Sequence, residues 1–424
     1  QIVVTSFLML FKSLIGLLTQ INLLFLTMVF CTSCEKVDVE DSIGQNSELT
    51  EDKYQDSLSL KSDPFSLSST HSKQLEIYQS LFLNNDCPYK LPGNLSLETK
   101  LRLFEEIREG YFTKSVFLDH EIKKYYHNFA HAMDVMITTH VLLKSGGAIF
   151  LTQDEQAMLV LAALAHDARH TGLMNSFLIK AEHEYAKKFD HESLQEKQSL
   201  LFLLGLLESN QLIEPNEDSK IRKFLSEVII FTDMQRHKEQ LQKVTKVVPE
   251  VLDKLRTARG DKNSDITLGA TSVDLDKGID LSSRLDESTR FLIASFILHC
   301  ADISNPGKEW DQSERWAILV LNEFFKQGDF EKQQGMEVSM NCDREKTSIP
   351  ESQLGFGKYI IKELYDVLLQ LNHEAGSQFQ ENFGANQLKW TNLRVEEKLN
   401  KTRYLPNFRP PSEEGGWNGK EQGY

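Results

Sequence analysis

The sequence lacks a surplus of positive charge. Its 424 residues include 47 Lys and Arg against 62 Asp and Glu, which gives a formal net charge of −15. A protein that grips a nucleic-acid backbone needs a basic face, so we expect no nucleic-acid partner. Bound divalent cations can reverse the sign of the local field, and a small phosphate ester therefore remains an acceptable ligand.

Cysteine is scarce and shows no regular spacing. The five cysteines are Cys31, Cys34, Cys87, Cys300 and Cys342. A secreted disulfide scaffold would carry an even, patterned set, so we expect reduced thiols in a cytosolic domain. The Cys31-x-x-Cys34 pair has no second pair to complete a four-cysteine zinc site, and palmitoylation there is a weaker alternative.

Alternating apolar and polar strands and internal repeats are also missing. From about residue 76 the pattern is helical instead, and an all-α fold is expected. Thr152-x-x-Glu155 resembles a capping box that opens a helix reaching residue 166. The stretch 291–301 is apolar nearly all round and should be a central helix. Further helices are expected over 316–325 and 360–371, with long loops at 260–280 and 328–355.

One long apolar run stands at the N-terminus, over residues 7–30. About 20 such residues can cross a bilayer, and no basic start or small-residue cleavage site indicates a signal peptide. Lys12, Gln20 and Asn22 are costly in lipid, so a buried or interfacial helix is the alternative. The length favours a membrane span, and we assign residues 1–34 to a membrane-spanning or membrane-anchoring segment.

Four segments follow from these patterns. Residues 35–75 are acidic and Ser-rich and read as a solvated linker. Residues 76–400 form the folded domain, and 401–424 a C-terminal tail. We expect membrane localisation, with the folded domain facing the cytoplasm; a homodimer is compatible with the sequence. The first residue is Gln rather than Met, which indicates a processed N-terminus or a fragment.

His127 and His131 are four residues apart, so in a helix they share one face. A single buried His is more often a satisfied core residue than a ligand. Two on one face bring the metal-ligand interpretation to about even with a core role.

A second polar group follows seven apolar residues at 159–165, which run directly into His166 and Asp167. A buried ionised Asp without a partner costs roughly several kcal/mol. A divalent cation would satisfy it, with a neutral His nitrogen as a neighbouring ligand. The alternative is an ion pair with Arg169 or His170.

A third apolar stretch, from Phe296, ends in His299-Cys-Ala-Asp302. Asp302 could simply accept a hydrogen bond at a helix end. An acidic residue is disfavoured near a helix C-terminus, however, where the dipole is negative, and a cation would remove this conflict.

Together these stretches supply two His and two Asp, namely His131, His166, Asp167 and Asp302. This set suits Zn²⁺ with a harder cation, Mg²⁺ or Mn²⁺, beside it. Two metals about 4 Å apart commonly serve to displace an oxygen at phosphorus, by turning a bridging water into hydroxide. His127 would then be free to act as a general acid.

At these motifs the sequence resembles the class I 3′,5′-cyclic nucleotide phosphodiesterases, over about residues 90–395. The ordered motifs are Tyr-His-Asn-Phe-Ala-His-Ala-x-Asp-Val at 126–135, His-Asp-x-x-His-x-Gly-x-x-Asn at 166–175, Thr-Asp-Met at 232–234, His-Cys-Ala-Asp-Ile-Ser-Asn-Pro at 299–306, Glu-Phe-Phe-x-Gln-Gly-Asp at 323–329 and Ser-Gln-Leu-Gly-Phe at 352–356.

The resemblance implies a compact multi-helix catalytic domain of the HD type and a role for each matching residue. It makes His131, His166, Asp167 and Asp302 the ligands of the first metal, with Asp167 reaching the second. It implies that His170, Glu196 and Thr232 hold the waters of the second metal, and that His127 donates a proton to the departing 3′ oxygen. Substrate contacts would come from Tyr126, Asn305, Val320, Gln353 and Phe356, with Gln353 on the purine edge and Phe356 opposite Val320 on its faces.

The implied function is hydrolysis of the 3′ phosphoester bond of a cyclic nucleotide to the 5′-monophosphate in signal transduction. Asn305 followed by Pro306 resembles the versions that prefer cAMP, and cGMP remains an alternative substrate. Two other functions stay open: a weakly active or inactive protein that binds cyclic nucleotide, and a phosphohydrolase for other nucleotides.

Several positions depart from the family pattern. Gln198 and Ser199 stand where two histidines are usual after Glu196, and Arg169 where an acidic residue is common. The family has a carboxylate just before a late Trp, and this carboxylate orients the residue that matches His127. Lys389 stands in its place here, and Glu396 or Glu397 is the expected substitute. Met340 and Asn341 replace the usual Pro and Met, which changes the expected pocket shape.

Overall fold

The computed structural model describes residues 58–404, except for residues 60, 94, 118–119, 215–218 and 261–267. The apolar run at 7–30, the pair Cys31 and Cys34, and the tail from residue 405 lie outside the described residues. Within the described part of the chain, no helix is both long and apolar enough to span a bilayer. Membrane attachment therefore stays a prediction.

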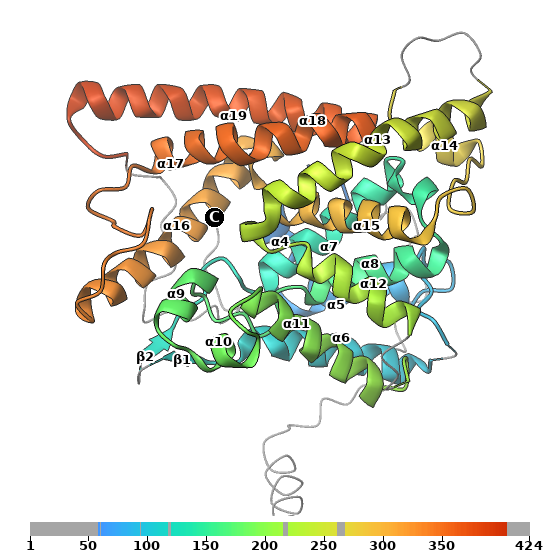
Figure 1. The fold of residues 1–424 in the computed structure, drawn as a ribbon, viewed down its shortest axis with the longest axis horizontal. Coiled ribbons are helices and arrows are strands. Elements are labelled where there is room, and N and C mark those ends of the chain that lie inside the picture. The colour runs from blue at the N-terminus through green and yellow to red at the C-terminus, as the bar shows by residue number, and fades with distance from the viewer. Residues whose placement is uncertain are drawn as a thin grey trace, which may run out of the picture. The chain divides into compact units, whose positions relative to one another are not determined.

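The described chain is almost entirely helical, as the all-α expectation required (Figure 1). Its α-helices are α4 (Pro64–Leu67), α5 (His71–Phe82), α6 (Leu97–Phe112), α7 (Phe129–Lys144), α8 (Gln153–Ala165), α9 (Asn175–Lys180), α10 (Glu184–Lys188), α11 (Leu194–Ser209), α12 (Lys220–Ile230), α13 (His237–Arg259), α14 (Ser272–Asp276), α15 (Glu287–Asp302), α16 (Trp310–Gln333), α17 (Ile349–Phe356), α18 (Lys362–Leu371) and α19 (His373–Asn400). Short 3₁₀ turns cover Gly147–Phe150, Met234–Arg236 and Asn305–Gly307, and a π turn, η4, covers Gly357–Ile361.

One feature that no sequence pattern indicated is a small antiparallel ribbon of β1 (Ser115–Phe117) and β2 (His120–Ile122). Each strand has only three residues, which is too short for an alternating pattern to stand out. The ribbon leaves the helical architecture unchanged.

The capping box expected at the start of α8 is confirmed. The Thr152 hydroxyl accepts from the Glu155 backbone N–H at 3.3 Å, and the Glu155 carboxylate accepts from the Thr152 N–H at 3.0 Å. Two donors at the helix start are thereby satisfied. The helix runs from this fixed start to His166, its C-terminal cap, so the cap sets where the polar end of the helix lies.

The expectation of a loop from residue 328 is wrong at its start, because α16 continues to Gln333. Gly328 lies inside this helix, which it does not interrupt, and another segment of the chain packs closely against it. A Cβ at this position would lie 1.9 Å from the Cys342 carbonyl oxygen. Glycine therefore lets the segment around Cys342 pack directly against α16.

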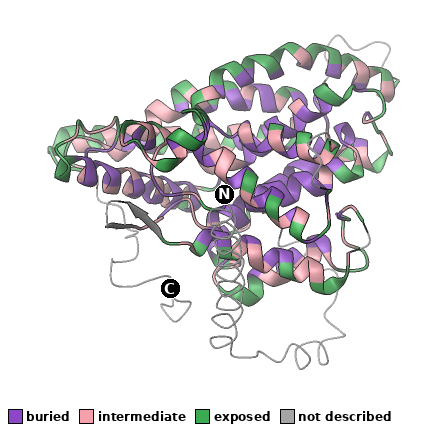
Figure 2. Cartoon of the chain, turned by 60° about the horizontal axis from the view of Figure 1, so that its bottom comes forward, coloured by how far each residue is buried: buried purple, intermediate pink, exposed green. Residues whose placement is uncertain are grey.

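The core lies where α7, α8, α12 and α15 pack on one another, and Figure 2 shows these inner faces as buried. Helix α15 is buried along most of its length, as the apolar run at 291–301 indicated. Helices α18 and α19 form a long hairpin along one side (Figure 1). The ends of α8 and α15 and the start of α7 therefore meet inside the domain.

Helix α4 and the first residues of α5 fall in the range 35–75, where the sequence suggested a linker. Phe65 on α4 is 4% exposed and packs on Trp316 with ring centroids 4.5 Å apart. Trp316 in turn lies 5.5 Å from the Tyr126 ring and 5.7 Å from the His131 ring. This short helix thus backs two residues singled out from the sequence.

A buried ion pair joins α7 to the segment before α16. The Lys308 ammonium donates to the Asp134 carboxylate and, at 3.0 Å, to the Thr138 hydroxyl. Both charged side chains are less than 5% exposed. A buried charge that loses its partner keeps its desolvation cost, so this pair makes the domain sensitive to loss of either member.

We expect Asp134→Ala to lower the free energy of unfolding by about 3–5 kcal/mol, because Lys308 would stay buried without its counter-charge. Denaturant unfolding followed by circular dichroism measures the change. Glu250→Ala removes one member of an exposed pair with Lys254 and should cost no more than about 1 kcal/mol. Equal losses in the two variants would contradict the prediction.

Candidate active site

Four side chains from three separate helices meet in one cluster. His131 comes from the first turn of α7, His166 and Asp167 follow α8, and Asp302 ends α15. One ligand atom from each lies within 4.8 Å of the others. The structure thus brings together all four residues that the sequence suggested as ligands of a first metal.

The hydrogen bond of His166 Nδ1 determines which ring nitrogen faces the two carboxylates of the cluster. Its Nδ1 lies 2.8 Å from the Ala163 carbonyl oxygen and must donate to it, so in the neutral imidazole Nε2 carries the lone pair. This lone pair faces Asp302 at 3.3 Å and Asp167 at 3.2 Å. Three electron-rich groups facing one another need a positive charge between them, and the donor set of His and Asp fits a divalent cation.

The pKa of His166 reflects the same demand. Burial acts to lower this pKa, but the carboxylates of Asp167 and Asp302 outweigh burial and raise it well above its usual range. His131 lies 3.1 Å from the Asp302 carboxylate through Nε2 and is also buried. The cluster therefore attracts a cation or, in its place, a proton.

The three residues assigned to the second metal, His170, Glu196 and Thr232, line the same cavity as Asp167 and Asp302 of this cluster. Burial and the nearby Asp233 raise the pKa of Glu196 to about 7, and the Asn175 amide donates to its carboxylate at 2.9 Å. Burial and the neighbouring His127 lower the pKa of His170 to about 3, so His170 is neutral. Thr232 is buried, and its hydroxyl donates to the Ile229 carbonyl at 2.8 Å.

The carboxylate that orients His127 is Glu323. Its Oε1 accepts from His127 Nδ1, and its Oε2 accepts from the Tyr126 backbone N–H at 2.9 Å and the His127 N–H at 3.3 Å. Burial lowers the pKa of His127, but Glu323 and Asp167 outweigh it and raise the pKa to about 9. His127 is therefore held as an imidazolium whose Nε2 is free to donate.

The two carboxylates suggested for this role were the wrong ones. Glu397 accepts from the Ser348 hydroxyl at 2.5 Å and the Tyr404 N–H at 2.7 Å, and Glu396 is exposed. The sequence did contain a signal for Glu323. It lies among apolar residues on the buried face of α16, where an acidic residue needs a partner.

Gln198 and Ser199, which stand where the family has two histidines, both make hydrogen bonds in the described structure. The Ser199 hydroxyl donates to the Ala168 carbonyl at 2.8 Å. Gln195, which the sequence analysis did not single out, donates to Thr171 Oγ1 at 2.7 Å and the Leu173 carbonyl at 2.8 Å. These bonds fix the segment that carries His170. Arg169 points elsewhere, with its guanidinium 4.8 Å from the Phe202 ring centroid.

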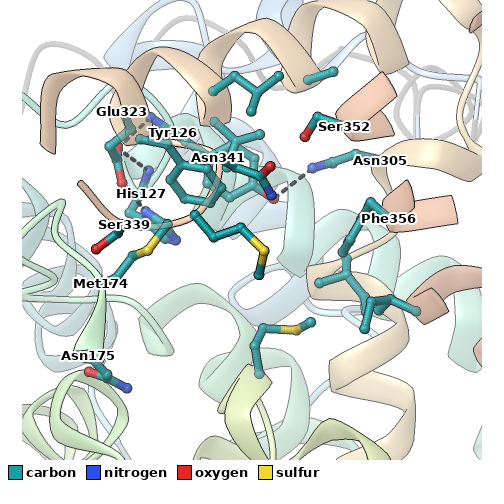
Figure 3. Close-up of a pocket in the computed structure, with 18 of the residues that line it drawn as sticks. Tyr126, His127, Met174, Asn175, Asn305, Glu323, Ser339, Asn341, Ser352 and Phe356 are labelled. Carbon is teal, nitrogen blue, oxygen red and sulfur yellow. Dashed lines mark hydrogen bonds and ion pairs between the residues drawn. The ribbon is translucent and has the colours of Figure 1, made fainter. Parts of the chain in front are cut away.

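A cavity of about 1070 Å³ opens onto the cluster. Figure 3 shows His127 and Glu323 on one side of it and Asn305, Ser352 and Phe356 on the other. All five residues suggested as substrate contacts line it, namely Tyr126, Asn305, Val320, Gln353 and Phe356. One hollow therefore offers both a charged end and a slot suited to a flat ring.

Tyr126 and Asn305 orient each other at the edge of this slot (Figure 3). The Asn305 side-chain NH₂ donates to the Tyr126 hydroxyl at 2.6 Å, and this hydroxyl lies 3.5 Å from the Asp302 carbonyl oxygen, to which it donates. In this orientation Oδ1 is the remaining polar atom of the amide, and this buried oxygen has no partner among the described residues.

Comparison with known proteins adds curated relatives. A dual specificity calcium/calmodulin-dependent 3′,5′-cyclic nucleotide phosphodiesterase 1C from Homo sapiens is 31% identical over 261 residues, which cover 59% of this chain and 32% of the relative. The corresponding phosphodiesterase 1 of Drosophila melanogaster is 31% identical over 243 residues, 56% of this chain and 25% of the relative. The matched region thus spans a third or less of these relatives.

Solved structures show the same fold. LmjPDEB1, solved in complex with IBMX, matches with a TM-score of 0.64 and 21% identity over 80% of this chain and 93% of that chain. The phosphodiesterase domain of the Salpingoeca rosetta rhodopsin phosphodiesterase matches with a TM-score of 0.65 and 21% identity, over 81% and 94% respectively.

The family model for 3′5′-cyclic nucleotide phosphodiesterase matches residues 126–382. This span includes every metal-cluster and cavity residue discussed above. Because the model covers more than half of the chain, the protein belongs to the 3′,5′-cyclic nucleotide phosphodiesterase family.

Proposed function

We propose that this chain hydrolyses the 3′ phosphoester bond of a 3′,5′-cyclic nucleotide and releases the 5′-monophosphate. One observation supports this above the others: the cation-demanding cluster and the slot for a flat ring open into one cavity. A cyclic nucleotide has a phosphate and a purine at opposite ends, and so matches both parts. We place this activity in cyclic nucleotide signalling.

Two divalent cations are part of the proposal, Zn²⁺ with Mg²⁺ or Mn²⁺. His131, His166, Asp167 and Asp302 would hold the first, and His170, Glu196 and Thr232 would bind waters of the second. When bound, the cations neutralise the phosphate and make water a stronger nucleophile at neutral pH. The protein supplies the ligand geometry, and the fixed tautomer of His166 is part of it.

His127 supplies the proton for the leaving group. Its Nδ1 is held by Glu323, so Nε2–H faces the cavity. Hydroxide, from a water that has given a proton to the solvent, would form the new bond to phosphorus. The bond from phosphorus to the 3′ oxygen breaks, the proton passes from His127 to that oxygen, and His127 then takes up a proton from the solvent. A pKa of about 9 keeps the acid charged at neutral pH.

The orientation of Asn305 supports a preference for cAMP. Its Oδ1 is an acceptor without a partner in the described structure. The 6-amino group of adenine is a donor and would pair with it, whereas guanine presents an acceptor at this position. Gln353 would add a further hydrogen bond, and Val320 and Phe356 would flank the ring. Membrane attachment through residues 7–30, a cytoplasm-facing domain and a homodimer remain predictions from the sequence.

Steady-state assays of the whole chain with Mg²⁺ test the function, and we expect 5′-AMP from cAMP at lower KM than 5′-GMP from cGMP. Tight binding of cAMP without turnover would instead support the weakly active alternative. Gln353→Ala should raise KM for either nucleotide. Unchanged kinetics in this variant would favour a phosphohydrolase for other nucleotides.

Metal analysis of the purified protein tests the cluster. His131→Ala and Asp302→Ala should lose bound metal and activity together, because each removes one of four ligands. His127→Ala is the matched control, since it should keep its metal and yet lose rate by about 10²–10⁴-fold. Metal retained in full by the first two variants would refute the assigned ligands.

Glu323→Gln should move the alkaline limb of the pH–rate profile to lower pH. Glu323 raises the pKa of His127, so its removal makes the imidazolium lose its proton earlier as the pH rises, and the acid catalyst is lost with it. Asp311→Asn, at the exposed start of the same helix, should leave the profile in place. An unmoved limb in Glu323→Gln would show that His127 is not the titrating acid.

A further inference from the structure

A tight turn after α16 brings Asn341 to the cavity. Figure 3 draws its side chain over the middle of the cavity, in this view between Ser339 and Asn305. The Asn341 backbone has φ = +64°, in the left-handed region. Asn is one of the few residues other than Gly that adopt this conformation readily, and it stands where the family pattern has Met.

The turn is held firmly from behind. The Ser339 N–H and hydroxyl donate to the carboxylate of Glu331 at 2.6 and 2.5 Å, and Glu331 is fully buried. The Cys342 N–H closes the turn on the Ser339 carbonyl at 3.0 Å, and Cys342 packs against Gly328. The position of Asn341 is therefore set by α16 rather than by the ligand.

The Asn341 amide has no hydrogen-bond partner in the part of the chain that the structure describes. It thus offers two donors and an acceptor to the contents of the cavity. Asn305, by contrast, has already committed its NH₂ to Tyr126. Asn341 is uncharged, which suits a neutral polar group of a ligand better than a phosphate.

We propose that Asn341 hydrogen-bonds a neutral polar group of the bound cyclic nucleotide, either the base edge or the ribose hydroxyl, and so helps to determine specificity. This inference rests on the proposed function. An amide that contacts ground state and transition state alike changes KM and leaves kcat nearly constant. A net hydrogen bond of ordinary strength corresponds to about a three- to tenfold change in KM.

Asn341→Gly is the sharpest variant, because Gly keeps the left-handed backbone and removes only the amide. Asn341→Met restores the family residue. Gln211→Gly is the matched control: Gln211 is exposed, has φ = +59° and lies outside the residues that line the cavity. KM and kcat are measured with cAMP, cGMP and 2′-deoxy-cAMP. Kd is measured by equilibrium titration of cAMP in the His127→Ala background, which does not depend on turnover.

We expect Asn341→Gly and Asn341→Met to raise KM and Kd for cAMP by about three- to tenfold, with Gln211→Gly unchanged. If the effect disappears with 2′-deoxy-cAMP, Asn341 contacts the ribose hydroxyl; if it persists, Asn341 contacts the base. Both results support the proposal.

Values for Asn341→Gly within twofold of wild type for all three nucleotides, with wild-type turnover intact, would overturn the role of Asn341 and leave the hydrolytic function standing. A wild type that binds cAMP without hydrolysing it, together with weaker binding by Asn341→Gly, would overturn the hydrolytic function and support the role of Asn341. Absence of both binding and turnover in the wild type would overturn both proposals.

Discussion

Two carboxylates that lie close to one buried imidazole constrain the arrangement of the helices around them. The carboxylates of Asp167 and Asp302 lie 3.2 and 3.3 Å from Nε2 of the buried His166, and the two Asp side chains are 15% and 14% exposed. Such an arrangement is unfavourable unless a positive charge joins it. The helices that deliver these groups must be rigid, because the repulsion would otherwise push them apart. The buried contacts among α7, α8, α12 and α15 supply that rigidity.

Two residues, Asp302 and Glu323, each bind more than one group of the candidate site and so set the relative positions of these groups. Asp302 offers its carboxylate to the cluster and its backbone carbonyl to Tyr126, which orients Asn305. Glu323 binds His127 with one oxygen and the backbone of residues 126 and 127 with the other. Shared hydrogen bonds therefore connect the groups around the cluster with Tyr126 and Asn305, which suits the proposed substrate, whose phosphate and base lie a fixed distance apart.

The sequence predicted the parts of this site that depend on strong local signals. His-Asp at the end of an apolar run and Asp302 at the end of α15 are polar residues in places where only a partner makes them tolerable. Glu323 carried the same kind of signal, but the sequence could not name its partner, and Gln195 carried none; their partners lie far away in sequence and only the packed fold shows them. Likewise Gly328 suggested a loop, and only the contact with Cys342 shows that it sits inside a helix.

Helix α4 has a consequence for anything attached ahead of it. Phe65 closes the rear of Trp316, whose indole also supports Tyr126 and His131. The first helix of the described domain therefore lies one residue, Trp316, away from Tyr126 and His131 of the candidate site. A force on the chain ahead of α4 would pull Phe65 away from Trp316, and Trp316 packs against His131. Displacement of the upstream chain would thus disturb the support of a cluster residue.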